Sequence, residues 1–135
     1  MSDCIFCKIV KKEIPADVVF ENEKIIAFLD IRPSAPGHTL VVPKVHAEDI
    51  LVTSDEALLE TMRAAKKVAK AAMTSVKAEG FNLITNTKPA AGQAVFHTHF
   101  HIIPRFSNDG LKHWPHKEVP KETQQQIKEA MKKLL

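Results

Sequence analysis

The sequence contains only two cysteines, which is too few for the disulfide framework that stabilises many small secreted domains. It also contains no apolar run long enough to span a membrane, and its first residues show no basic segment followed by an apolar stretch. These absences argue against a transmembrane helix and against a secretory signal. We therefore expect a soluble, cytoplasmic protein with no membrane partner.

A strong charge of either sign is also absent. The 19 lysines and arginines nearly balance the 16 acidic residues, which gives a formal net charge of +3. Because the lysines are spread along the chain, we expect no specific nucleic-acid binding, although a local basic patch could still attract a phosphate group.

The length and periodicity of the chain predict one domain over residues 1–135, because no internal repeat or low-complexity segment divides it. Thr53 and Glu56 form a candidate capping box, and Gly80 stands where a helix often ends. Strands joined by hairpins around one long helix are typical of an antiparallel α+β domain. The predicted elements are a short helix over 4–12, a hairpin of strands at 18–20 and 25–29, a strand at 39–43, a long helix over about 53–79, strands at 81–87 and 95–104, and a terminal helix over 120–135.

The most informative segment is the alternating run His97-Thr98-His99-Phe100-His101. In an extended strand the three imidazoles would line one face, with neighbours about 7 Å apart, so that one phosphate group could lie across two of them. A neutral imidazole is a good nucleophile toward phosphorus, and a second one can bind a phosphoryl oxygen. The same three side chains could instead hold a catalytic zinc ion, and the spacing alone leaves both interpretations open.

The two cysteines, Cys4 and Cys7, form a C-x-x-C motif with three possible roles. A thioredoxin-like redox motif would need a βαβ context, which the predicted elements lack. A tetrahedral zinc site would need two further ligands, for which imidazoles are suitable. The third possibility is a pair of packing thiols without a metal.

The segment from Gly92 to Ile103 closely resembles the signature of the histidine triad (HIT) family of nucleotide hydrolases and transferases. Four further blocks resemble the family in the same order along the chain: Ile5-Phe6-Cys7-Lys8-Ile9, Ala27-Phe28-Leu29-Asp30-Ile31, Ala35-Pro36-Gly37-His38 and Val41-Val42-Pro43-Lys44. The resemblance implies a five-stranded antiparallel sheet with one long helix and a C-terminal helix. It also implies a homodimer whose two sheets continue as one, with a nucleotide cleft on each subunit.

The resemblance further implies roles for single residues. His99 would be the nucleophile that attacks the α-phosphorus and forms a nucleotidyl-histidine intermediate, with His101 beside it. Asp30 would accept both ribose hydroxyls, although its place before Ile31-Arg32-Pro33 also suits a turn. The implied substrate-binding residues are Phe6, Ile9, Phe28 and Ile31 around the base, Asp30 at the ribose, and His38, Asn86, Gly92, Gln93, Ala94 and Val95 around the phosphates.

Two further expectations follow from the resemblance. Cys4, Cys7, His46 and His97 align with a structural zinc site of Cys₂His₂ type. Ala94 departs from the family pattern, because some phosphoramidase members carry a serine there that can hydrogen-bond the leaving group. We therefore expect a purine nucleotidyl hydrolase or transferase with phosphoramidate or adenylate substrates. A dinucleoside polyphosphate hydrolase and a nucleotide-binding interaction protein with little turnover are the alternatives.

Overall fold

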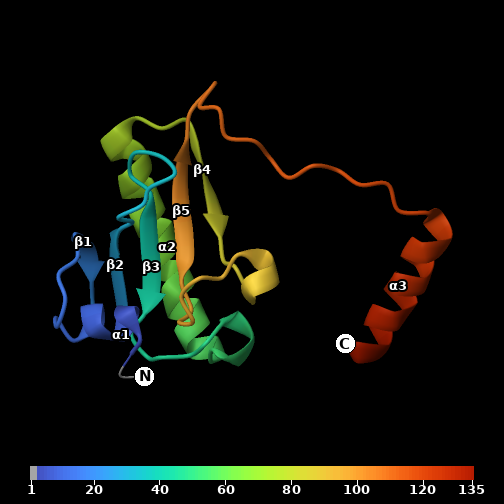
Figure 1. Cartoon of the computed structure of the whole chain (residues 1–135), viewed down its shortest axis with the longest axis horizontal. Coiled ribbons are helices and arrows are strands. Elements are labelled where there is room, and N and C mark those ends of the chain that lie inside the picture. The colour runs from blue at the N-terminus through green and yellow to red at the C-terminus, as the bar shows by residue number, and fades with distance from the viewer. Residues whose placement is uncertain (1–2) are drawn as a thin grey trace.

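The computed structural model describes residues 3–135 and shows a five-stranded antiparallel sheet with helices, so the predicted α+β class is confirmed. The strands follow the order β1-β2-β3-β5-β4 across the sheet, which makes β1 and β4 the two edges (Figure 1). In chain order the elements are α1 (Ile5–Val10), β1 (Val18–Glu21), β2 (Ile25–Leu29), β3 (Thr39–Pro43), α2 (Asp55–Val76), β4 (Gly80–Ile84), β5 (Phe100–Arg105) and α3 (Lys121–Leu134), with short 3₁₀ helices at Ile50–Val52 and Pro89–Ala91.

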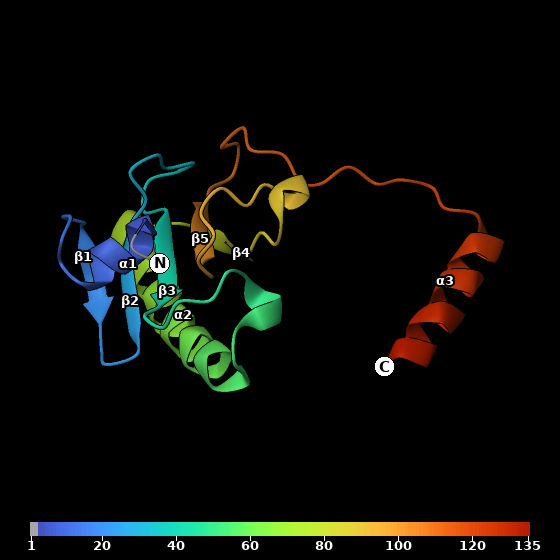
Figure 2. The ribbon, with the colours of Figure 1, turned by 60° about the horizontal axis from the view of Figure 1, so that its bottom comes forward.

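Two apolar clusters lie on opposite faces of the sheet because the central strands are buried on both sides. On one face, α2 packs its small residues, such as Ala65 and Ala69, against Val41 and Ile102. On the other face, Phe6 and Ile9 of α1 pack against the opposite side chains of β2 and β3. Figure 2 shows α1 and α2 on the two sides of the sheet.

The long helix is shorter than predicted at both ends. Ser54, rather than Thr53, is the N-cap, and its side chain accepts a hydrogen bond from the amide of Ala57. Thr53 is instead buried, and its hydroxyl donates to the carbonyl of Asp49. At the other end Lys77 adopts the left-handed conformation that ends the helix, so Gly80 is free to begin β4.

The histidine strand is also shorter than predicted, since β5 begins only at Phe100. The preceding segment pairs with a loop instead of a strand: the amide of Thr98 donates to the carbonyl of Ala47. The β4 strand ends at Ile84 rather than at residue 87. The terminal helix begins at Lys121 with Pro120 as its N-cap, and it lies well apart from the sheet in both views (Figures 1 and 2).

Candidate functional site

The three histidines lie at the start of β5 and in the segment before it. His101 lies within β5, whereas His97 and His99 precede the strand, and only the rings of His99 and His101 are neighbours, with centroids 5.0 Å apart. The ring of His97 turns toward His46 and the two cysteines. The expected extended strand was wrong for His97 and His99, because β5 begins only at Phe100 and the chain bends at His97. The expected common face is retained, since the rings of His97 and His99 both contact Phe6 on the α1 side of the sheet.

The protonation pattern of His99 follows from its contacts. Its Nδ1 lies 2.6 Å from the carbonyl oxygen of His97, which can only accept, so Nδ1 carries the proton and Nε2 keeps its lone pair. Burial lowers the pKa of His99, so the ring is neutral at pH 7. The edge of its ring meets Phe6, and its carbonyl accepts a hydrogen bond from the hydroxyl of Thr85. These contacts fix the ring's orientation and leave a neutral nitrogen as a potential nucleophile.

A second hydrogen-bonded chain fixes His101. The amide of Ser34 donates to Nδ1 of His38 across 2.9 Å, so the proton of neutral His38 resides on Nε2. That Nε2 donates to Nδ1 of His101, also across 2.9 Å, which leaves the proton of His101 on its own Nε2. Burial, with smaller contributions from His99 and His38, lowers the pKa of His101 to about 4. His101 is therefore neutral at pH 7 and carries an N–H donor next to His99.

Asp30 lies beside His38, just after the end of β2. Its amide donates to the carbonyl of His38, and one carboxylate oxygen lies 3.5 Å from Nε2 of the same histidine. The other carboxylate oxygen accepts a hydrogen bond from the amide of Arg32. The expected ribose acceptor is thus also the residue that stabilises the turn after β2.

The expected base-pocket residues divide into two groups. Phe6, Ile9 and Phe28 are buried in one apolar cluster, where the rings of Phe6 and Phe28 meet edge to face. Ile31 is 87% exposed. An apolar wall therefore lies beside His99, and Ile31 would have to lie against a bound base from the solvent side.

The loop from Asn86 to Gly92 has an unusual backbone that the sequence did not reveal. Lys88 combines a φ of 75° with a ψ of 155°, a region that residues other than glycine rarely adopt. The amide of Lys88 donates to the side-chain oxygen of Gln93, and its ammonium lies 2.9 Å from the buried carboxylate of Asp49. The only sequence signal for this strain is that Pro89 follows Lys88, because proline restricts the residue before it.

Gln93 is fully engaged within this loop. Its side-chain nitrogen donates to the carbonyls of Glu48 and Val95, so the side chain links the loop to the segment before the histidines. Gly92 adopts a positive φ of 95° beside the side chain of Asn86. Ala94 is exposed and Val95 half-buried; both line a cavity of about 390 Å³ that also contains Cys4, His46 and Glu48.

A second cluster, formed by Cys4, Cys7, His46 and His97, could hold a metal ion. Nδ1 of His97 lies 3.4 Å from Sγ of Cys4, 3.6 Å from Sγ of Cys7 and 3.2 Å from Nδ1 of His46, and Sγ of Cys7 lies 3.3 Å from the last atom. Nε2 of His97 donates to the carbonyl of Pro43, so its Nδ1 presents a lone pair to the other three atoms. The structure thus brings together the four residues expected as metal ligands.

The sequence and the fold were compared with those of known proteins. The model of the HIT domain family matches residues 11–108. The chain belongs to the HIT family. The chain is 47% identical over 113 residues to an uncharacterised HIT-like protein of Borreliella burgdorferi, which covers 82% of this chain and 81% of that protein. It is 43% identical over 118 residues to the adenosine 5′-monophosphoramidase of Saccharomyces cerevisiae, with 86% of this chain and 72% of that protein covered.

Two solved structures of HIT proteins share the fold. The crystal structure of a HIT family member from Bacillus subtilis matches with a TM-score of 0.91 at 39% identity and covers 98% of this chain and 97% of that one. A zinc-bound histidine triad protein from Mycobacterium smegmatis matches with a TM-score of 0.79 at 35% identity, covering 98% and 96%. Among residues 3–135, no helix is both long and apolar enough to cross a membrane.

Proposed function

We propose that the protein is a nucleotidyl hydrolase or transferase that acts at the α-phosphate of a purine nucleoside monophosphate derivative, with His99 as the nucleophile. The single observation that carries this proposal is the hydrogen bond from Nδ1 of His99 to the carbonyl of His97, which leaves a neutral Nε2 with a free lone pair. The yeast relative's activity as a monophosphoramidase supports the same class of reaction.

The proposed reaction has two steps. Nε2 of His99 attacks the α-phosphorus, the bond to the leaving group breaks, and the leaving group departs with the bonding electron pair and takes up a proton. Water then attacks the same phosphorus, which releases the nucleoside monophosphate and restores His99. Nε2–H of His101 donates to a phosphoryl oxygen in both steps, because the hydrogen bond from His38 holds its proton on that nitrogen.

The remaining residues would bind the nucleotide. Phe6, Ile9, Phe28 and Ile31 would contact the base, and Asp30 would accept the two ribose hydroxyls. Within the loop that contains Asn86, Gly92, Gln93, Ala94 and Val95, the amides of Gly92 and Gln93 already donate to the carbonyls of Pro89 and Lys88. The amides of Ala94 and Val95 and the side chain of Asn86 would therefore donate to the phosphate oxygens, with His38 behind them. Because Ala94 has no hydroxyl, the chain lacks one donor to a leaving-group nitrogen.

The test is to mix the protein with an adenylated amine, an adenylated carboxylate and a diadenosine polyphosphate, and to quench each reaction within the first turnover. We expect an acid-labile adenylyl adduct on His99, seen as a mass increase of the intact chain that is absent from His99→Ala. The three rates then identify the preferred leaving group. A protein that binds these nucleotides without forming an adduct or turning over would contradict the proposal and favour a binding protein.

We also propose that the four-residue cluster holds a structural zinc ion. A tetrahedron with Zn–N bonds of about 2.0 Å and Zn–S bonds of about 2.3 Å has an N–N edge of roughly 3.3 Å and N–S edges of roughly 3.5 Å. The N–N distance of 3.2 Å and the N–S distances of 3.3–3.6 Å are close to these values. Two thiolates and two imidazoles in this arrangement are typical of zinc. All four ligands of the ion would come from the protein, and the ion would join α1 to the segment before β5.

We further propose a homodimer that forms through β4. This edge strand pairs only with β5, and its Phe81 and Leu83 are exposed. Leu83 lies opposite Ile102, which packs against α2, so Leu83 lies on the face of the sheet that α2 covers. On α2 itself, Leu59 and Met62 are exposed. Pairing β4 with its symmetry mate would continue the sheet and bury these side chains. Sedimentation velocity of the wild-type protein and of Leu83→Lys tests this proposal, with a monomeric wild type as the contradicting result.

A further inference from the structure

The C-terminal helix is amphipathic and has no partner within its own chain. Ile127, Met131 and Leu134 recur at intervals of four and three residues, so they form one apolar stripe along α3. Every residue from 110 to 135 is exposed, including this stripe. An isolated helix of 14 residues is only marginally stable in water, and most helices in proteins depend on packing of the apolar face. The stripe therefore needs a surface to cover it.

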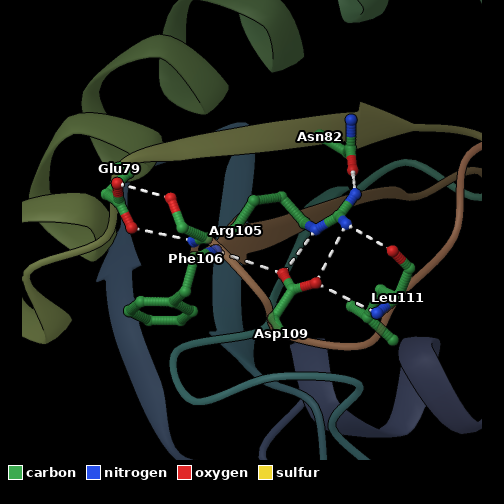
Figure 3. Close-up of polar contacts among 7 residues, drawn as sticks. Glu79, Asn82, Arg105, Phe106, Asp109 and Leu111 are labelled. Atoms are coloured by element: carbon green, nitrogen blue, oxygen red, sulfur yellow. Dashed lines mark hydrogen bonds and ion pairs between the residues drawn. The ribbon is translucent and has the colours of Figure 1, made fainter.

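A hydrogen-bonded turn sets where the chain leaves the sheet after β5 (Figure 3). Arg105, the last residue of β5, donates to both carboxylate oxygens of Asp109, to the side chain of Asn82 and to the carbonyl of Leu111. Asp109 in turn accepts from the amides of Phe106 and Leu111. These contacts hold the turn against β4, so the segment that follows runs beyond the β4 edge and away from the sheet.

A second set of hydrogen bonds holds the other side of the turn. Glu79 accepts hydrogen bonds from the amide and the hydroxyl of Ser107, both at 2.8 Å. Figure 3 shows the two sets of contacts on either side of Phe106. The match to the Bacillus subtilis structure includes the C-terminal helix, because it covers 98% of the chain with a TM-score of 0.91, whereas residues 1–105 are less than four fifths of the chain. The extended position of α3 is therefore shared with a crystallised relative.

The opposite edge of the sheet carries an apolar groove. It lies between β1 and the C-terminal half of α2, has a volume of about 530 Å³ and has one charged lining residue, Lys67. Val19, Leu29, Ala72 and Val76 contribute its apolar walls. Because β1 and β4 are the two edges of the sheet, the groove and α3 lie on opposite sides of the same molecule (Figure 1). In this structure α3 therefore lies far from the groove of its own chain.

We propose that α3 of one molecule docks in the β1–α2 groove of a second copy of the chain, and that the second copy does the same in return. The inference rests on the proposed homodimer. A partner joined at β4 stands on the side toward which the turn at Arg105–Asp109 directs the arm. Residues 106–120 form an arm that can extend over roughly 50 Å at about 3.3 Å per residue, enough to cross a five-stranded sheet about 20 Å wide. Reciprocal docking would bury both apolar stripes and both grooves, and the two contacts would be related by the twofold axis of the dimer.

The experiment places a photoactivatable benzoylphenylalanine at residue 131 of the full-length protein, in an equal mixture of ¹⁴N- and ¹⁵N-labelled chains. Gln125, on the opposite face of α3, is the matched control position. We expect severalfold more crosslinked dimer from position 131 than from position 125, with mixed-isotope peptide pairs that join α3 to residues 17–29 or 67–76. Met131→Glu in the unlabelled protein should weaken the dimer, whereas Gln125→Glu should leave it unchanged.

Three results would overturn the inference. Crosslinks within one chain would place the stripe on its own molecule, and intermolecular crosslinks to other peptides would remove the groove as the receiving surface. Equal crosslinking from positions 131 and 125 would show that the stripe is uncovered. Sedimentation velocity separates these outcomes from failure of the dimer proposal: a dimer without groove crosslinks contradicts only the docking of α3, whereas a monomer contradicts both.

Discussion

The backbone carbonyl of His97 accepts the Nδ1 proton of His99 across 2.6 Å, while the side chain of the same His97 belongs to the candidate metal cluster. One residue thus links a structural site to the proposed nucleophile. The hydrogen bond fixes the tautomer of His99, and the metal ligands fix the position of His97. The candidate metal cluster and the proposed nucleophile are therefore joined through His97.

Metal removal should test this link. We predict about one zinc ion per chain in protein purified without added metal, and a decrease in melting temperature of roughly 10 °C or more after chelation. Cys7→Ser should lower both the zinc content and kcat, because a displaced His97 no longer orients His99. His116→Ala, at an exposed histidine outside both clusters, is the matched control and should change neither quantity. A zinc content near zero, or a native disulfide between Cys4 and Cys7, would contradict the metal assignment.

Loss of the nucleophile should abolish turnover without loss of binding. We predict that His99→Ala lowers kcat on the order of 10³-fold or more, since covalent catalysis has no other neutral imidazole in the same position. Nucleotide affinity should change little, because the proposed base and ribose contacts are made by other residues. Calorimetric titration with a nucleoside monophosphate measures the affinity. Retention of a tenth of the wild-type kcat would exclude His99 as the nucleophile.

The stability of the protein should depend on pH in the way expected for histidines that are neutral in the folded state. Burial lowers the pKa of His38 and His99, and it lowers that of His101 to about 4. The unfolded chain binds the proton with a pKa near 6.5, so the stability contribution of neutral His101 is complete above pH 6.5 and is lost as the pH falls toward 4. The loss is on the order of 3 kcal/mol.

Urea unfolding between pH 4 and pH 8 measures this effect. His101→Gln should remove part of the acid-dependent loss, whereas His116→Ala should retain all of it. The kcat/KM of the wild-type enzyme should be level across neutral pH and fall only in acid, as His99 and His101 become protonated. An acid limb centred at or above pH 6.5 would show that these rings are not neutral in the folded protein.

Asp30 should discriminate ribose from deoxyribose. We predict that Asp30→Ala weakens the binding of ribonucleotides by about 1–3 kcal/mol, because two charge-assisted hydrogen bonds are lost. The penalty for 2′-deoxyribonucleotides should be smaller. Asp30→Asn is the structural control, since its side-chain oxygen can still accept from the amide of Arg32 and keep the turn intact. Equal losses for both sugars would remove Asp30 from the ribose site.

The backbone of Lys88 is strained, and the effect of relieving this strain on stability should depend on whether Asp49 is present. Lys88→Gly relieves the unfavourable φ and ψ but leaves the buried carboxylate of Asp49 without its ammonium partner, so the single variant should be less stable than the wild type. In an Asp49→Asn background no charge is left unpaired, and the same glycine substitution should be stabilising. Urea unfolding measures the free energy of unfolding of the wild type, Lys88→Gly, Asp49→Asn and the double variant, which together form a double-mutant cycle. Destabilisation by glycine in both backgrounds would show that the backbone of Lys88 is not strained.

The amino-acid sequence by itself determined the class of the fold and gave the candidate residues that the structure brings together. Short apolar runs separated by a polar stretch and a proline-rich turn predicted the strands at 18–20, 25–29 and 39–43, and each lies in the structure close to those bounds. These predictions succeeded because side-chain periodicity and local turns decide such elements. The four metal-site residues could also be named, because the C-x-x-C spacing and the resemblance to the HIT family both pointed to them.

Only the tertiary structure decided how those residues divide between two sites. Alternation placed His97 on the same face as His99, and both rings contact Phe6, but the ring of His97 also lies against His46 and the two cysteines. The amide of Thr98 donates to the carbonyl of Ala47, and the hydroxyl of Thr53 contacts that of Thr98 and donates to the carbonyl of Asp49. The same contacts explain why Ser54 rather than Thr53 caps α2. Sequence periodicity could not reveal the contacts of Thr98 with Ala47 and Thr53, because they join residues 51 and 45 positions apart. The turn after β5 likewise depends on hydrogen bonds that Arg105 donates to Asn82 and Ser107 donates to Glu79. No local sequence pattern encodes these contacts.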